Sequence, residues 1–329
     1  MRKRQQVHRL NGMLAAAAGM AALLLGAGPI LAGAAAAKRR HVPSPVPNGF
    51  YGGGAIGPRH TRTQSDIQYV NIKADSRARS ITFYADASAA CQHTKAAANT
   101  ELVSFYPTGI SVHNGHFSAT GVTPADGSQG SPNVSYSLSG HFVTAARAVG
   151  TMSAHGTFPG ANGDVATCTV PRVSFTVTDP KLSIGSGKLV AGAAYYGNMI
   201  YVPKKDRTPF VLRVSKDGRH LAQLATEFNY DCTPSVGVAG NGFFQGRVEW
   251  PPPPFPIDKH GAFTIHDHGH RAIPGEPNLV GDETVVIHGR FGRYRLSGTW
   301  RDDITVSNAS THQVAGSCTT HTEQFQATL

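Results

Sequence analysis

A patterned stretch near the C-terminus, residues 285–300, places the strongest constraint on how this chain can fold. It reads VVIHGRFGRYRLSGTW and alternates apolar and polar residues on both sides of a glycine-containing turn. Such alternation is typical of half-buried antiparallel strands joined as a hairpin. A weaker version lies upstream, where Tyr136–Phe142 is followed by a turn and Gly150–Met152. The sequence therefore predicts one β-rich domain made twice.

Cysteines stand at matching places around the two versions of this pattern. Cys91 and Cys168 are 77 residues apart, and Cys232 and Cys318 are 86 residues apart. The longer second interval contains Trp250–Pro256, whose four consecutive prolines cannot donate to a sheet ladder and predict a polyproline loop. The similar spacing supports an internal duplication.

These patterns predict an all-β fold of two tandem homologous antiparallel domains, each a small meander barrel or a sandwich of seven or eight short strands. Alternate apolar residues on Ile81–Cys91 and on Leu224–Cys232 would point into the core together with the cysteines. Further strands are expected at Ile67–Ile72 and Phe210–Val214. Ala90–Thr100 is the only helix candidate outside the N-terminal leader, and it is short.

Five segments follow from these patterns. We expect a signal peptide at 1–37, a basic and proline-rich tether at 38–48, a first β-domain at 49–178, a linker at 179–192 and a second β-domain at 193–329. The leader has a basic start, an apolar run from Met13 to Ala37 and small residues at its end, which is typical of a cleaved export signal. An uncleaved anchor helix is the alternative. No other stretch is long and apolar enough to cross a membrane as a helix, so the mature protein is expected to be secreted.

The net charge of +10 resembles that of a nucleic-acid-binding protein until the charges are located. Seven of the lysines and arginines and none of the acidic residues fall within the first forty residues, so the rest of the chain carries only +3. Nucleic-acid binding calls for a basic stripe interleaved with aromatic residues, and the sequence has none. We therefore expect no nucleic-acid partner.

Four cysteines in an exported chain predict disulfides, for which three connectivities are possible. The duplication selects Cys91–Cys168 and Cys232–Cys318, one in each domain. No Cys-Xaa-Xaa-Cys motif is present, so the sequence indicates neither a redox motif nor a structural zinc site.

The cluster His266, His268 and His270 is the most distinctive candidate for chemistry. Histidines two apart project from the same face of a strand, and imidazole is a good ligand for Zn or Cu. The chain has 16 histidines, so a polar loop tip that is rich in histidine by chance is the alternative. No cofactor is expected apart from this possible metal ion.

Two other groups of residues are candidate sites. Trp250 and Phe255, beside the proline run, could stack on a sugar or a partner protein, or could cover the end of their own domain. Asp302 and Asp303 could act in acid–base catalysis, but neighbours on a strand face opposite ways, which argues against a shared site. No catalytic residue is therefore assigned, and the sequence favours a protein that is not an enzyme.

The motif order resembles that of a β-rich domain found in uncharacterised secreted proteins of high-GC Gram-positive bacteria. The second half carries the motifs Tyr195-Tyr-Gly197, Phe210–Val214, Cys232, Gly261-Ala-Phe263, Gly289-Arg-Phe291, Gly298-Thr299, Cys318 and Phe325. The first half matches with Tyr51, Cys91, Phe117, Phe142, Gly150-Thr151, Cys168 and Phe175. No activity is assigned to that group, so the resemblance implies fold and export but no site.

Three functional hypotheses remain, one of which is a purely structural or host-facing surface protein. The first is a non-catalytic extracellular module that binds a cell-wall polymer, a surface partner or a small ligand. The alternative is a metal-binding protein or metal-assisted hydrolase that uses His266, His268 and His270.

Overall fold

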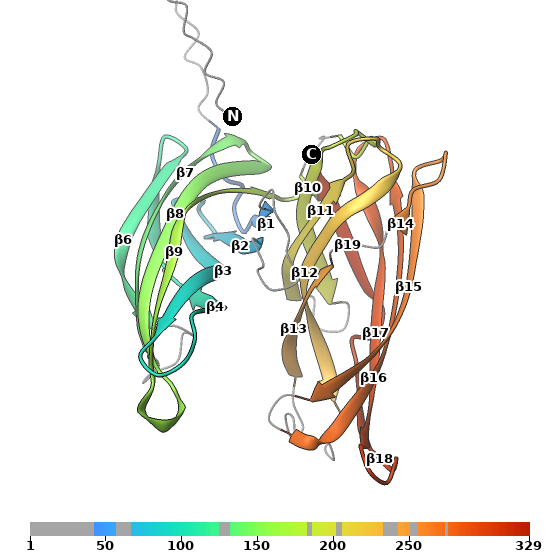
Figure 1. Ribbon diagram of the computed structural model, residues 1–329. Coiled ribbons are helices and arrows are strands. Elements are labelled where there is room, and N and C mark those ends of the chain that lie inside the picture. Colours follow the sequence, from blue (N-terminus) through green and yellow to red (C-terminus); the bar gives the residue numbers. More distant parts are fainter. Residues whose placement is uncertain are drawn as a thin grey trace, which may run out of the picture. The chain divides into compact units, whose positions relative to one another are not determined.

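Strands make up most of the described part of the chain (Figure 1). The structure is a computed structural model that describes residues 43–56, 67–124, 132–182, 186–201, 206–232, 243–250, 255–273 and 276–329. The expected signal peptide and the first residues of the tether lie outside the described residues. No helix among the described residues has the length and apolar character needed to span a bilayer.

The first sheet is antiparallel and closes on itself as a ring. Its strands run in the order β2-β1-β9-β8-β7-β6-β5-β3-β4, and both β2 and β9 also pair with β3. The nine strands are β1 (Phe50–Ile56), β2 (Ile67–Ala74), β3 (Ser80–His93), β4 (Asn99–Phe105), β5 (Ile110–His113), β6 (His116–Pro124), β7 (Asn133–Thr144), β8 (Arg147–Pro159) and β9 (Val165–Thr178).

The second sheet is an antiparallel half-barrel with the order β13-β12-β11-β10-β19-β17-β16-β15. Strand β14 pairs with β12, and β18 bridges β12 and β17. The ten strands are β10 (Ala194–Tyr201), β11 (Asp206–Val214), β12 (His220–Cys232), β13 (Phe243–Trp250), β14 (Phe255–Pro256), β15 (Ala262–Ile273), β16 (Glu276–Phe291), β17 (Leu296–Asn308), β18 (Val314–Thr319) and β19 (Glu323–Thr328).

The predicted all-β class with two antiparallel sheets is confirmed, while two details differ. The described residues form nine and ten strands where seven or eight were expected, in part because β14 follows the proline run as a further short strand. The helix candidate Ala90–Thr100 is wrong, because it spans the end of β3, a turn and the start of β4. Cross-strand pairing of β3 with β4 and β9 overrides the helix propensity of its alanines.

Both predicted disulfides are present, and each joins residues directly opposite one another on neighbouring strands. Cys91 on β3 bonds to Cys168 on β9, and Cys232 on β12 bonds to Cys318 on β18. The described residues include no free cysteine. Cys91 lies in the core with the alternate residues of its strand, as the sequence pattern predicts.

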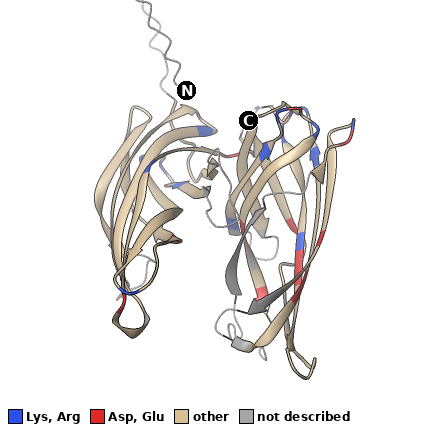
Figure 2. Cartoon of the chain, viewed as in Figure 1, with Lys and Arg blue, Asp and Glu red and all other residues tan. Residues whose placement is uncertain are grey.

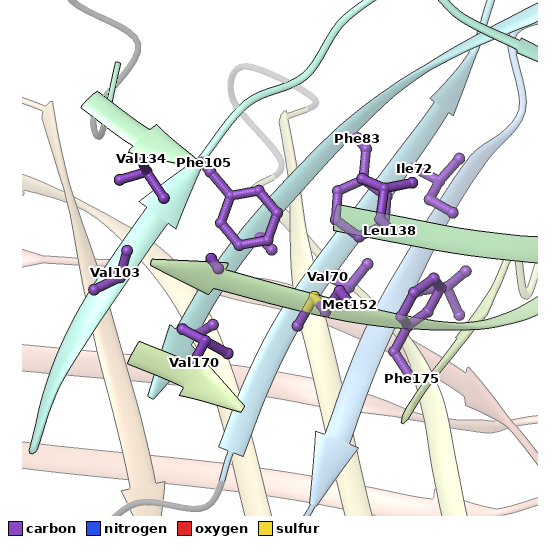
Figure 3. Packing of buried hydrophobic residues seen from close by; sticks show 14 of the residues in the cluster. Val70, Ile72, Phe83, Val103, Phe105, Val134, Leu138, Met152, Val170 and Phe175 are labelled. Carbon is purple, nitrogen blue, oxygen red and sulfur yellow. The ribbon is translucent and has the colours of Figure 1, made fainter. Parts of the chain in front are cut away.

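Apolar side chains from every part of the first ring meet in one core (Figure 3). Phe83, Phe105 and Phe175 are among its largest members, and Phe83 contacts the other two rings at centroid distances of 6.1 and 5.4 Å. The second sheet encloses a separate core, in which Trp300 stacks on Phe228 at 5.2 Å. Each sheet therefore buries its own apolar face.

The same cross-strand row of glycine and phenylalanine recurs in both sheets. Each row crosses four neighbouring strands, with two glycines in the middle and a phenylalanine at either end. The rows are Phe117, Gly140, Gly150 and Phe175 on β6, β7, β8 and β9, and Phe263, Gly289, Gly298 and Phe325 on β15, β16, β17 and β19.

Each phenylalanine ring occupies the space that its glycine partner leaves open. A Cβ atom added at Gly140 would lie 2.5 Å from the Phe117 ring, and one at Gly298 would lie 2.3 Å from the Phe325 ring. Glycine in a strand interior often marks such a close approach, and the aromatic ring restores the packing that the glycine lacks. The repeated Gly-Xaa-Phe and Gly-Thr patterns of the sequence are therefore packing motifs.

A tyrosine near the start of each sheet also forms matching contacts. The hydroxyl oxygens of Tyr51 and Tyr195 accept hydrogen bonds from the backbone N–H groups of Val46 and Val190, at 2.9 and 3.0 Å. The hydroxyls donate to the carbonyls of Ala145 and Lys188. Burial raises the pKa of Tyr51 to about 12 and also raises the pKa of Tyr195. Both side chains are fully buried, so they act as core plugs.

Charged side chains are sparse along the described strands (Figure 2). This agrees with the low content of charged residues, 15% of the whole chain. No basic stripe is visible along the described strands in this view.

The glycine–phenylalanine row leads to a stability prediction. Gly298→Ala places a methyl group against the His288 carbonyl oxygen and the Phe325 ring, at 2.0 and 2.3 Å before relaxation. Overpacking of this kind costs about 1–3 kcal/mol of unfolding free energy. Gly269→Ala, in strand β15, is the matched control because its new methyl group meets no atom closer than 3.9 Å. Urea unfolding should show a loss for the first variant and little change or a slight gain for the second; equal midpoints would contradict the packing role.

Candidate functional site

A polar groove of about 800 Å³ lies on the solvent-facing side of the first sheet, over strands β5 to β9. Its walls carry hydroxyl groups, imidazoles and one guanidinium group. The lining residues are Ser111, His113, His116, Phe117, Ser118, Ser139, Gly140, His141, Val149, Gly150, Thr151, Arg172, Ser174, Phe175 and Thr176.

A row of hydroxyl groups crosses four strands of the groove. Ser118 on β6 pairs with Ser139 on β7, which pairs with Thr151 on β8, which pairs with Ser174 on β9. The Ser139 and Thr151 hydroxyl oxygens lie 3.3 Å apart. Because antiparallel strands lie about 4.8 Å apart, the row presents hydrogen-bonding groups at a regular spacing.

A row of histidines runs beside the hydroxyl row, two residues away along each strand. His113 on β5 pairs with His116 on β6, and His116 pairs with His141 on β7. The His116 and His141 rings are stacked, with centroids 5.3 Å apart. All three side chains are exposed, so their N–H groups are accessible to a ligand.

A β-bulge directs Arg172 toward the hydroxyl row. The register between β8 and β9 shifts between Met152 and Ala154, where Pro171 and Arg172 together face Ser153. Proline cannot donate to the ladder, so it is tolerated in a bulge, and bulges commonly re-aim a side chain. Arg172 Nη2 donates to Thr151 Oγ1 at 3.3 Å.

The glycines of the first row form the floor of the groove. Gly140 and Gly150 line the groove, and the rings of Phe117 and Phe175 fill the space on their buried side. Glycine brings the backbone close to whatever occupies the groove. The residues one position away along each strand point to solvent, so the packing row below sets the position of the polar rows above.

The predicted metal cluster is only partly assembled. His266, His268 and His270 are all exposed on β15, as expected for residues two apart on a strand. Among the described residues, their ligand atoms do not all lie within 4.8 Å of one another. His268 Nδ1 is 3.1 Å from Thr284 Oγ1, and His270 Nδ1 is 2.6 Å from Asp282 Oδ1. Metal binding there stays a prediction.

The one described group with metal-ligand spacing is Cys91, Glu101 and Cys168. Both sulfur atoms are engaged in the disulfide, which removes the thiolates that a metal would need. This group is therefore a disulfide with a carboxylate beside it.

The predicted aromatic ligand site lies only partly within the described structure, so it stays a prediction. Phe255 is partly buried and packs against the core of the second sheet, which matches the end-covering alternative. Trp250 pairs with Leu224 through the backbone, and its side chain lies outside the described part of the structure.

The two neighbouring aspartates face opposite sides of β17, as expected. Asp302 is fully buried and accepts a hydrogen bond of 2.5 Å from the Tyr230 hydroxyl. Asp303 faces outward and accepts from Arg301 Nε at 2.6 Å. The two carboxylates cannot act together on one bound molecule.

The sequence analysis missed the groove, although a signal for it was present. The tripeptide Gly-His-Phe occurs at 115–117 and again at 140–142. In a strand whose phenylalanine points inward, the preceding histidine must point outward. Two such tripeptides on paired strands place His116 and His141 side by side.

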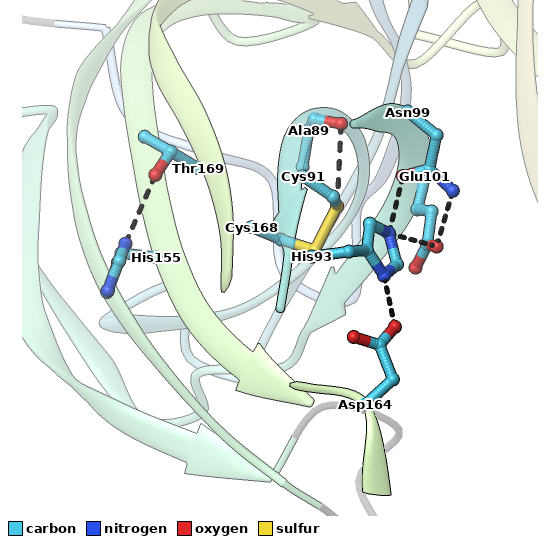
Figure 4. Close-up of a disulfide and its surroundings, with 9 residues drawn as sticks. All are labelled: Ala89, Cys91, His93, Asn99, Glu101, His155, Asp164, Cys168 and Thr169. Carbon is cyan, nitrogen blue, oxygen red and sulfur yellow. Dashed lines mark hydrogen bonds and ion pairs between the residues drawn. A yellow bond between two sulfur atoms is a disulfide. The ribbon is translucent and has the colours of Figure 1, made fainter. Parts of the chain in front are cut away.

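A second polar cluster surrounds the first disulfide (Figure 4). His93 Nδ1 lies 2.7 Å from Asp164 Oδ2, and His93 Nε2 lies 3.0 Å from Asn99 Oδ1 and 3.5 Å from Glu101 Oε1. The hydrogen bond to Asp164 is the main cause that raises the pKa of His93, and the same bond holds the pKa of Asp164 at about 2. The pair links the loops that follow β3 and precede β9.

Comparisons with known proteins identify no family. No protein-family model matches the chain, and no curated protein sequence matches it. One solved structure is similar over 85% of this chain and 96% of its own: a protein of unknown function from the DUF3598 family of Nostoc punctiforme. Its sequence identity is 10% and its TM-score is 0.17, so it carries no argument about fold or function.

The His93–Asp164 pair leads to a prediction about the pKa of His93. Asp164→Asn should lower the pKa of His93, and Glu101→Gln, which removes a weaker contributor, should lower it less. NMR titration of the His93 ring protons measures the pKa in both variants.

The contribution of the His93–Asp164 pair to stability should be complete below the unfolded pKa of histidine and disappear as the pH rises through the raised pKa of folded His93. At acid pH the same contribution to stability should disappear as the pH falls from the unfolded pKa of aspartate through the folded pKa of Asp164, which is about 2. An unchanged pKa of His93 in Asp164→Asn would refute the assignment.

Proposed function

We propose that this protein is an exported, non-catalytic binding protein whose first β-domain holds a polyhydroxylated ligand, such as a cell-wall polymer, in the groove. The row Ser118, Ser139, Thr151 and Ser174 carries the proposal. Hydroxyl groups both donate and accept hydrogen bonds, so a row of them can satisfy the hydroxyls of a sugar or polyol in either direction.

The size and shape of the groove suit such a ligand. Its volume of about 800 Å³ falls within the ordinary range for small-ligand sites. The hydroxyl row crosses several strands and thus offers contacts to consecutive units of a polymeric ligand. A glycine floor lets the ligand lie close to the sheet.

Export is supported by the cysteines and by the leader pattern. Two disulfides favour an oxidising, extracellular environment. The signal peptide at 1–37 would deliver the chain there. The linker at 179–192 would join the two domains after cleavage.

We also infer that the two halves are copies of one domain. Three kinds of contact occur in both: the glycine–phenylalanine row, the buried tyrosine that accepts a bond from five residues upstream, and the cross-strand disulfide. Shared packing in all three places is a stronger sign of duplication than matching residue spacing alone.

The hydroxyl row predicts a specific loss of binding. Thr151→Val keeps the branched shape but removes one hydroxyl, which should weaken binding about 3- to 10-fold. Thr157→Val is the matched control, because Thr157 is exposed on the same strand but outside the groove. NMR amide-shift titration with soluble dextran, polyglycerol and poly(glycerol phosphate) measures both variants. The proposal fails if the wild-type groove responds to none of these polymers.

A further inference from the structure

The titratable and charged side chains that line the groove are all bases. They are Arg172, His113, His116 and His141, and no aspartate or glutamate is among the described lining residues. A neutral sugar can be bound through hydroxyl and amide groups alone, whereas basic side chains also attract an anion.

Some histidines elsewhere in the described structure lie beside a carboxylate, whereas those in the groove do not. Four histidines outside the groove lie within ion-pair distance of an aspartate: His93 with Asp164, His220 with Asp217, His270 with Asp282 and His321 with Asp231. The described residues supply no such partner to His113, His116 or His141. The groove therefore keeps its positive or proton-donating groups available to a ligand.

The bases lie beside the hydroxyl row. His116 and Ser118 are two residues apart on β6, as are Ser139 and His141 on β7, so each pair projects from one face about 7 Å apart. Arg172 reaches the same row from β9 through its bond to Thr151. An anionic group in the groove would thus be bound next to hydroxyl groups of the same ligand.

We infer that the groove recognises a polyol or sugar chain that carries phosphate groups, bound by Arg172 and the row His113, His116 and His141. This rests on the proposed function and narrows its ligand class. A guanidinium group binds phosphate through parallel N–H groups, and the imidazole N–H groups add further donors. A phosphodiester offers two non-bridging oxygens and two ester oxygens as acceptors, which suits this number of donors.

The test compares a charged polymer with its neutral analogue. Poly(glycerol phosphate) should bind at least about tenfold more tightly than polyglycerol at low ionic strength, and added salt should reduce the difference. Arg172→Gln should lower the affinity for poly(glycerol phosphate) about tenfold and that for polyglycerol by a smaller factor, because Arg172 also donates to the Thr151 hydroxyl. Arg77→Gln is the charge-matched control, because Arg77 is exposed in the turn after β2 and outside the groove.

Calorimetric titration of the full chain separates the outcomes, with circular dichroism to show that the variants fold. Equal affinity for the charged and neutral polymers would overturn the phosphate inference and leave the proposed function standing. An equal loss for both polymers in Arg172→Gln would also overturn it. Polygalacturonate tests whether a carboxylate polymer binds equally well. If its affinity equals that of poly(glycerol phosphate), the preference for phosphate is refuted. Failure of every polymer to bind would overturn the proposed function itself.

Discussion

Close packing between glycines and phenylalanines on neighbouring strands is the constraint on which both sheets depend. Two adjacent glycines leave a gap on the buried face, and a ring from each side fills it. No larger residue fits at Gly140 or Gly298 without moving a ring or a backbone carbonyl. Because the row spans four strands, it holds their register together, and a slip of one residue would turn every ring toward solvent.

Each disulfide joins two strands that share only a few residue pairs. Strands β3 and β9 share four residue pairs, of which Cys91–Cys168 is one, while seven pairs between β2 and β3 also close the first ring. In the second sheet β12 and β18 share only two pairs, one of which is Cys232–Cys318. Each disulfide therefore stabilises a short strand pairing. Each also closes a long loop in the unfolded chain, which favours the folded state.

The groove follows from the same geometry. Side chains alternate between the two faces of a strand, so a fixed buried row also determines which residues face solvent beside it. His116 and Ser118 flank Phe117, and Ser139 and His141 flank Gly140. The packing motif leaves these flanking positions free to vary, and in the second half the corresponding positions carry other residues, such as Ala262 and Thr264 beside Phe263. The side chains that line the groove can therefore change without loss of the core.

The sequence by itself determined the all-β class, the main strands and the disulfide pairing, because period-two alternation and matched cysteines are local or repeated signals. It also showed that Asp302 and Asp303 face apart. Only the tertiary structure decided ring closure, the extra strands and the polar groove. These depend on which strands become neighbours and in which register, and residues such as His141 and Arg172 line one groove only after distant strands pair. Residue spacing along the sequence does not show which strands pair. The sequence therefore predicted a site at the histidine cluster on β15 and did not predict the groove in the first sheet.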